Sequence, residues 1–204
     1  MLRKKKCIII FTEGETEIEF YDLLIEKIKK NKNIKKLNAD KIIKKTLKGI
    51  SKFDKKLLNK FRFDILPKYS DYDITIFLCY DTDVFEDCQK PVVDWKKVER
   101  ELLNCGVKKV SHIKAEKCIE DIFLLDMQGI CKYLNIKSIK NITGVNGVEK
   151  MKKIFLKGNR IYQKGYKCEG FIKHLDIDYI LKKKKEMFES LIDELIGVKE
   201  YEKN

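Results

Sequence analysis

Residues 7–17 read Cys-Ile-Ile-Ile-Phe-Thr-Glu-Gly-Glu-Thr-Glu, an apolar run that ends in a glycine set among acidic residues. The run is short, continuous and rich in isoleucine, which predicts a strand buried on both faces of a sheet. Apolar side chains then recur at helical spacing, which predicts an amphipathic helix over residues 15–31 with Thr16, or a residue just before it, as the N-cap. A strand that turns directly into a helix is typical of an α/β fold.

Outward from this stretch, strand and helix patterns alternate up to about residue 135. Strand patterns cover residues 41–47, 73–80 and 107–115, and helical patterns cover residues 53–65 (ending before Pro67), the end of a loop-and-helix segment over 91–104 that is closed by Gly106, and residues 119–134. The alternation predicts an α/β fold with a mostly parallel, Rossmann-like sheet and helices on both of its faces.

The rest of the chain has a different pattern. Residues 136–204 contain no convincing long strand, but they include a basic stretch punctuated by glycines and a long helical pattern over residues 176–196. The four lysines at 182–185 are explained most simply as the solvated face and flank of that helix. Because no long linker is present, we expect an α/β core over residues 1–135 and a basic, mainly helical extension over residues 136–204 packed on it.

The composition excludes several classes of protein. The chain has 204 residues, 44% of them hydrophobic, which is enough for an ordinary buried core and excludes wholesale disorder. No apolar run approaches the ~18 residues needed to span a bilayer. The basic N-terminus leads into an apolar run too short for a signal peptide, so we expect a cytoplasmic protein with no membrane segment.

Cysteine and histidine usage narrows the metal chemistry. The seven cysteines are odd in number and never spaced as CxxC, which argues against a disulfide framework and against a zinc knuckle. The two histidines are too few for sites built on several imidazoles. A metal would therefore be held mainly by carboxylates, which predicts a hard ion such as Mg²⁺ or Mn²⁺.

The formal net charge of +13 invites a nucleic-acid partner, but its composition weakens that inference. Only four of the 45 basic residues are arginine, and the enrichment in lysine, isoleucine and asparagine is typical of an AT-rich genome. Solvated lysines on helix faces explain part of the excess. A phosphate-binding protein would use the remainder to hold its ligand.

Acidic side chains gather where the predicted strands end. They are Glu13 after the first strand, Glu17 four residues later, Asp81 and Asp83 after the strand over residues 73–80, and Glu120 after the strand over residues 107–115, with Glu116 and Asp121 as alternatives to Glu120. The carboxyl ends of parallel strands meet at one edge of a sheet, so these acids should converge there. Like charges that close together favour a divalent cation. Taken singly, each acid could instead cap a helix or offset its dipole.

The two acidic motifs resemble those of the Toprim family. Residues 8–17 resemble its first motif, an apolar strand followed by glutamate, glycine and a second glutamate that opens a helix. Residues 77–83, Phe-Leu-Cys-Tyr-Asp-Thr-Asp, resemble its second motif, an apolar strand ending in DxD. The EGxTE form is similar to the OLD-group and stand-alone RloB-type nucleases. Residues 117–120, Lys-Cys-Ile-Glu, lie where RloB-type chains carry proline-cysteine-phenylalanine-glutamate.

The resemblance covers residues 7–130 and implies a Toprim-like fold. It further implies a metal-dependent nuclease that hydrolyses phosphodiester bonds in DNA or RNA with a bound water as the nucleophile, in a setting of defence against phage or mobile DNA. The residues carried over are Glu13, Asp81 and Asp83 for catalysis and metal binding, Glu17 and Glu120 for a second Mg²⁺ or Mn²⁺, and Lys114, Lys150, Lys153 or Lys164 as a basic residue near the scissile phosphate. The chain has no P-loop, so an ATPase partner would be a separate protein; a homo-oligomer is left open.

Two other functions stay open. A haloacid-dehalogenase-type phosphotransferase also has DxD after an apolar strand, but its pattern wants Thr or Val at the position of Phe85. A non-catalytic Toprim-like protein would only bind nucleic acid or a partner. Three other residues are predicted to have packing roles instead of chemical ones: a buried, hydrogen-bonded His112, a packed Trp95, and Tyr80 pointing away from the acids.

Overall fold

The fold is a four-stranded sheet in which every pair of neighbours is parallel, in the order β2-β1-β3-β4. The strands are β1 (Lys6–Thr12), β2 (Lys41–Thr46), β3 (Asp73–Asp81) and β4 (Lys109–Ala115). This computed structural model describes residues 3–31, 34, 36–83, 93–139, 141–166 and 170–197. The predicted loop at Pro91 and the position of Phe85 lie outside these ranges. The α/β class and the parallel sheet are confirmed.

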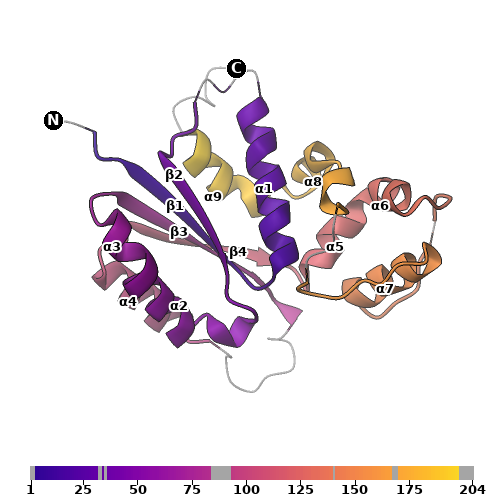
Figure 1. The fold of residues 1–204 in the computed structure, drawn as a ribbon, viewed down its shortest axis with the longest axis horizontal. Helices are drawn as coiled ribbons and strands as arrows, with labels where there is room; N and C mark the ends of the chain where they lie inside the picture. Colours follow the sequence, from indigo (N-terminus) through magenta and orange to yellow (C-terminus); the bar gives the residue numbers. More distant parts are fainter. Residues whose placement is uncertain are drawn as a thin grey trace.

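The central strand β1 is buried on both faces, as its continuous apolar run predicts. Ile8 and Ile10 enter the apolar cluster on one side of the sheet, while Cys7, Ile9 and Phe11 enter the cluster on the other. Alternation of side chains along an extended strand sends neighbours to opposite faces, so an unbroken apolar run needs a helical layer on each side. Figure 1 shows these two layers, with α2, α3 and α4 on one side and α1 and α9 on the other.

The first layer comes from the middle of the chain. It contains α2 (Lys55–Asn59), α3 (Leu66–Tyr69) and α4 (Trp95–Asn104), with a short 3-10 helix over Ile50–Lys52 and a π-helical segment over Lys60–Ile65. The predicted end before Pro67 is wrong, because helical structure continues to Tyr69. Pro67 is the second residue of α3 and follows the π-helical segment directly.

The second layer holds α1 (Glu15–Lys30) and the helices of the C-terminal part. These are α5 (Ile119–Phe123), α6 (Met127–Leu134), α7 (Gly147–Lys157), α8 (Ile177–Lys183) and α9 (Lys185–Ile196), with 3-10 helices over Leu124–Asp126 and Ile172–His174. Residues 141–166 and 170–197 contain no strand, and their apolar side chains join the same cluster as Ile8 and Ile10. The C-terminal part is therefore built onto one face of the sheet.

Two predicted helices are interrupted. The helix predicted over 119–134 breaks at the 3-10 segment, because the buried carboxylate of Asp126 accepts hydrogen bonds from the backbone N–H groups of Gly129 (3.0 Å) and Asp176 (2.6 Å). Asp126 thus caps α6 and ties it to the start of α8. The pattern over 176–196 is divided at Lys184 into α8 and α9. Within the described residues, no helix is long and apolar enough to cross a membrane.

Candidate functional site

The turn after β1 is fixed by hydrogen bonds to its own backbone. The carbonyl oxygen of Glu13 accepts from the Thr46 hydroxyl (3.0 Å) and from the Gly49 N–H (3.1 Å), and the Thr12 hydroxyl donates to the Gly14 carbonyl (3.0 Å). Gly14 is the N-cap of α1, so the predicted Thr16 cap is wrong and the alternative, a residue just before it, is confirmed. A Cβ at Gly14 would lie 2.7 Å from the Gly165 Cα. Only glycine allows this approach of two backbones.

Two glutamates extend from this turn toward the end of β3. The Glu13 carboxylate accepts a hydrogen bond from the Asp81 N–H at 2.9 Å. Burial raises the pKa of Glu13, although that hydrogen bond and the charge of Lys164 oppose the shift. Glu17 is 5% exposed and accepts from the Gly14 N–H, so one of its oxygens fills the helix-capping role. Burial first, and then the Asp81 charge, raise the pKa of Glu17 well above its ordinary value.

Asp81 links β3 to the helix after β4. Its side chain is 2% exposed; Oδ1 accepts from the Ile119 N–H at the start of α5 (2.9 Å), and Oδ2 lies 2.7 Å from the Lys164 ammonium. Burial raises the pKa of Asp81 to about 7, although Lys164 pulls it down. Asp83 Oδ2 lies 3.2 Å from the same ammonium, while its Oδ1 is buried and has no hydrogen-bond partner among the described residues.

Glu120 approaches the same edge from α5 and is 1% exposed. Its Oε1 accepts from the Tyr162 hydroxyl at 2.8 Å, and its Oε2 is buried without a hydrogen-bond partner in the described part of the chain. Of the alternatives to Glu120, Glu116 is exposed and pairs with Lys184 at 3.8 Å, and Asp121 accepts from the Cys118 thiol. The structure therefore brings Glu120 to the other acids, and not its two neighbours.

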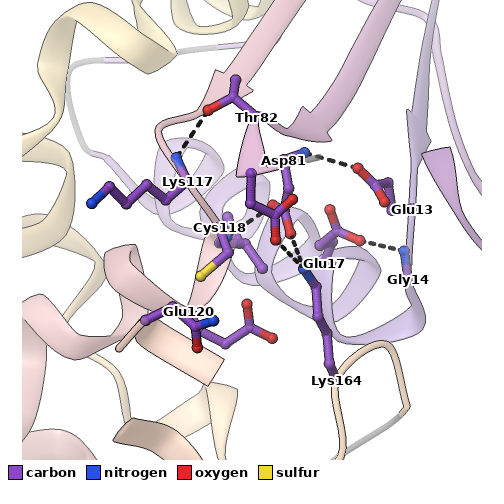
Figure 2. A network of polar contacts seen from close by, with 12 residues as sticks. Glu13, Gly14, Glu17, Asp81, Thr82, Lys117, Cys118, Glu120 and Lys164 are labelled. Atoms are coloured by element: carbon purple, nitrogen blue, oxygen red, sulfur yellow. Dashed lines mark hydrogen bonds and ion pairs between the residues drawn. The ribbon is translucent and has the colours of Figure 1, made fainter. Parts of the chain in front are cut away.

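Lys164 is the cation among these acids and comes from a loop far along the chain (Figure 2). The loop is tied to α1, since the Gly165 carbonyl accepts from the Glu15 N–H (3.1 Å) and the Tyr166 carbonyl accepts from the Thr16 hydroxyl (2.6 Å). Burial works to lower the pKa of Lys164, but the neighbouring carboxylates, Asp81 first, outweigh it, so the pKa lies above its ordinary value.

The other three predicted lysines lie elsewhere. Lys114 is exposed near the end of β4 and lines a different cavity. Lys153 pairs with Glu149 on its own helix at 2.9 Å, and Lys150 lies on the same helix beside Gly144. Only Lys164, of the four, reaches the carboxylates.

Four of the five acids border one cavity of about 360 Å³ with Lys164 at the carboxyl edge of the sheet, and Asp83 is not part of its lining. Its lining comprises Glu13, Gly14, Glu15, Thr16, Glu17, Lys48, Gly49, Asp81, Ile119, Glu120, Lys164, Gly165 and Tyr166. Residues at or just after the carboxyl ends of all four strands thus meet the loop that carries Lys164. Such an edge is the usual place for a ligand site in an α/β sheet.

The donor set suits a hard divalent cation, because it consists of carboxylate oxygens, two of which lack partners. The geometry does not yet form a coordination site. Within the described residues, no group of three or more His, Cys, Asp and Glu side chains could hold a metal ion as they stand. The Lys164 ammonium, between Asp81 and Asp83, supplies the positive charge at this place.

The three residues predicted to have packing roles lie on the far face of β3 and β4. Tyr80 stacks on Trp95 with ring centroids 4.2 Å apart, and its hydroxyl lies 3.0 Å from His112 Nδ1. His112 Nε2 lies 2.8 Å from Glu99, and burial lowers the pKa of His112. Tyr80 points away from the acids and Trp95 packs on it, as predicted; His112 is hydrogen-bonded as predicted but is only partly buried, with 17% of its side chain exposed.

Comparison of the chain with protein-family models, with curated proteins and with solved structures finds no match. The functional argument therefore depends on the chemistry of the cavity.

Proposed function

We propose that this chain is a Toprim-type nuclease that hydrolyses phosphodiester bonds in DNA or RNA with Mg²⁺ or Mn²⁺. One observation carries the proposal: the carboxylates of Glu13, Glu17, Asp81 and Glu120 line one cavity with the Lys164 ammonium, and Asp83 lies 3.2 Å from that ammonium. Two buried carboxylate oxygens, Asp83 Oδ1 and Glu120 Oε2, lack hydrogen-bond partners among the described residues. Glu17, Asp81 and Glu120 are buried, and buried carboxylates that face one cavity are unfavourable unless cations neutralise them. Lys164 neutralises only part of this charge, and the other lysine of the cavity, Lys48, pairs with Glu15 at 3.5 Å.

In this proposal, Glu13, Asp81 and Asp83 hold the metal, and Glu17 and Glu120 complete a second position. A bound divalent ion would lower the pKa of an attacking water, or would stabilise the negative charge that develops on the leaving oxygen. Tyr162 orients Glu120 through its 2.8 Å hydrogen bond. Lys164 balances the acids before metal binds, and its flexible ammonium then contacts the scissile phosphate.

The test is metal binding measured separately from cleavage. Calorimetric titration of Mg²⁺ and Mn²⁺ into metal-free protein should show binding that is lost in Asp81→Ala and Glu13→Ala. Cleavage of single- and double-stranded DNA and RNA should be lost in the same variants while their folds persist. Glu26→Ala is the matched control, because this exposed acid lies on α1, the helix that carries Glu17, but outside the cavity. Normal cleavage by Asp81→Ala would overturn the proposal.

A non-catalytic nucleic-acid- or partner-binding protein is the second candidate. It is favoured by the ion pairs of Lys164 with Asp81 (2.7 Å) and Asp83 (3.2 Å), which neutralise part of the acidic edge without a metal. This candidate predicts no calorimetric signal with either metal and no cleavage of any of the four substrates.

The wider setting is part of the same proposal. These 204 residues contain no GxxxxGK sequence, and by analogy with RloB-type proteins we propose that an ATPase is supplied by a separate partner. From the resemblance of the two acidic motifs alone, we propose that the nuclease acts in defence against phage or mobile DNA, and this part of the proposal does not depend on the cavity. Co-purification of a tagged chain from its native host, followed by an ATPase assay, tests the partner.

A further inference from the structure

A second cavity, of about 600 Å³, opens beyond the end of β4 and is rich in lysine. It is lined by Lys114, Lys117, Lys182, Lys183, Lys184 and Lys185, together with Glu116, Asp121, Ile122, Leu125, Glu186 and Met187. We call it the lysine groove. The groove joins the β4–α5 turn to the junction of α8 and α9, so residues far apart in sequence form one surface.

The groove has an excess of positive charge that its own acids do not cancel. Six lysines face three acids, and within the described ranges the ion pair found for these lysines is the 3.8 Å contact of Lys184 with Glu116. A second acid, Asp121, accepts from the Cys118 thiol. The Lys183 ammonium lies 5.6 Å from the centre of the Tyr179 ring, a contact that leaves its charge in place. Clustered ammonium groups repel one another, so an anionic ligand would stabilise this arrangement.

One short turn separates the lysine groove from the carboxylate cavity. Ile119 and Glu120 line the carboxylate cavity, whereas Lys117, Asp121 and Ile122 line the groove. The turn is held to the end of β3.

Lys117 forms the hydrogen bonds that hold the β4–α5 turn to the end of β3. The Lys117 carbonyl accepts from the N–H groups of Thr82 (3.1 Å) and Asp83 (2.9 Å), and its N–H donates to the Thr82 hydroxyl (2.9 Å). The Lys117 side chain itself points away from the carboxylates (Figure 2). The β4–α5 turn thus lies between the lysine groove and the carboxylate cavity.

A comparison within the molecule separates the groove from general lysine enrichment. Another cavity is lined by Lys29, Lys36, Lys41 and Lys44, but it lies at the start of β2 and the end of α1. That is the amino edge of the sheet, away from the acids, and Lys44 there pairs with Asp22. Enrichment alone places lysines at both edges, but only the carboxyl edge joins them to the acids.

We infer that the lysine groove binds the sugar-phosphate backbone of a nucleic acid and leads the strand across the β4–α5 turn to the carboxylate cavity. The identity of the polymer as a substrate rests on the proposed function, whereas its binding does not. Lysines act as point charges on phosphates, so binding is independent of base sequence and weakens steeply with salt.

The experiment measures binding without catalysis. Fluorescence anisotropy of labelled single- and double-stranded DNA and RNA is recorded in EDTA over a range of salt concentrations. The variant Lys182→Gln/Lys183→Gln/Lys185→Gln removes three exposed ammoniums from the groove. Each phosphate contact contributes about 0.7–0.9 to the slope of log affinity against log salt. The triple variant should therefore lower the slope by about 2 or more, and affinity at low salt should fall at least about tenfold.

A matched control separates the groove from net charge. Lys52→Gln/Lys55→Gln/Lys68→Gln removes the same charge from exposed positions near α2 and α3, on the opposite layer. It should leave affinity and slope unchanged. Equal weakening by both triple variants, or weakening by neither, overturns the inference. So does equal binding of polyglutamate by the wild-type chain, which would indicate an acidic protein partner.

These outcomes are distinguishable from failure of the proposed function. Groove-dependent binding without any metal-dependent cleavage supports the inference and favours the non-catalytic candidate. If cleavage depends on metal but the groove variant binds nucleic acid as tightly as the wild type, the inference is overturned and the nuclease proposal stands.

Discussion

Replacing Lys164 by methionine tests whether its ammonium is the internal counter-charge of the acidic edge. The substitution keeps an unbranched side chain but removes the charge that lies 2.7 Å from Asp81 Oδ2 and 3.2 Å from Asp83 Oδ2. Removing one partner of a fully buried pair costs about 3–5 kcal/mol. Asp81 is 2% exposed but the Lys164 side chain is 36% exposed, so solvent screening reduces the expected loss to about 1–3 kcal/mol.

The loss should depend on pH in a defined direction. Burial raises the pKa of Asp81 to about 7, so at lower pH this carboxyl takes up a proton and no longer needs a cation. Lys164 therefore stabilises the fold mainly when Asp81 is ionised, and its contribution should fade as the pH decreases through about 7. Lys164→Met should melt several degrees below the wild type near pH 8, at about 2–4 °C per kcal/mol for a chain of this size, and close to it near pH 5.

The assay is thermal and urea unfolding in EDTA, repeated with Mg²⁺ and with Mn²⁺. A divalent ion should stabilise Lys164→Met more than the wild type, because the ion supplies the missing charge without competition from an ammonium. Two results would refute the reasoning: equal stability of both proteins near pH 8 in EDTA, or equal stabilisation of both by metal. The first would mean that solvent fully screens the pair, and the second that lysine and metal occupy different places.

Three further substitutions probe the same edge. Burial and the nearby acids raise the pKa of Glu17, so its negative charge destabilises the fold increasingly as the pH rises above the ordinary pKa of a glutamate. In urea unfolding, Glu17→Gln should therefore be more stable than the wild type near pH 8 and equally stable near pH 4. Tyr162→Phe leaves Glu120 Oε1 without its donor and should cost about 1.5–3 kcal/mol, and a variant as stable as wild type would show that water replaces the hydroxyl. Gly14→Ala places a Cβ 2.7 Å from the Gly165 Cα and should destabilise the chain by about 1–3 kcal/mol, with weaker protection of the Gly165 loop from proteolysis as the diagnostic sign.

The meeting of the acids at the carboxyl ends of the strands could be predicted from the sequence, because it depends on local patterns. An unbroken apolar run requires two covering layers, and parallel strands place the residues that follow them at one edge. Glu13 and Asp81 met there for that reason. Local patterns do not predict the interruption of the helix at Asp126. The buried carboxylate there accepts a hydrogen bond from the backbone N–H of Asp176, a residue 50 positions away. No periodicity carries that information.

The roles of Lys164 and Tyr162 in the site could not be predicted from the sequence alone. Lys164 was one of four equivalent lysines, and Tyr162 had no assigned role. Their places depend on the close contact of Gly14 with Gly165 and on the hydroxyl of Thr16, and both are tertiary contacts. A glycine in each of two distant loops indicates such a contact only after the fold brings the loops together.

The distance along the chain between the acids and their cation has a consequence for synthesis. Lys164 is 81 residues downstream of Asp83, and Tyr162 is 42 residues downstream of Glu120. The ribosome therefore synthesises the four strands and all five acids before the residues that neutralise and orient these acids. Until then, the nascent chain carries like charges at an edge that it has no means to bury. Its acidic edge should stay open to proteases and chaperones, and a product that terminates before residue 162 should be degraded instead of accumulating as a folded core.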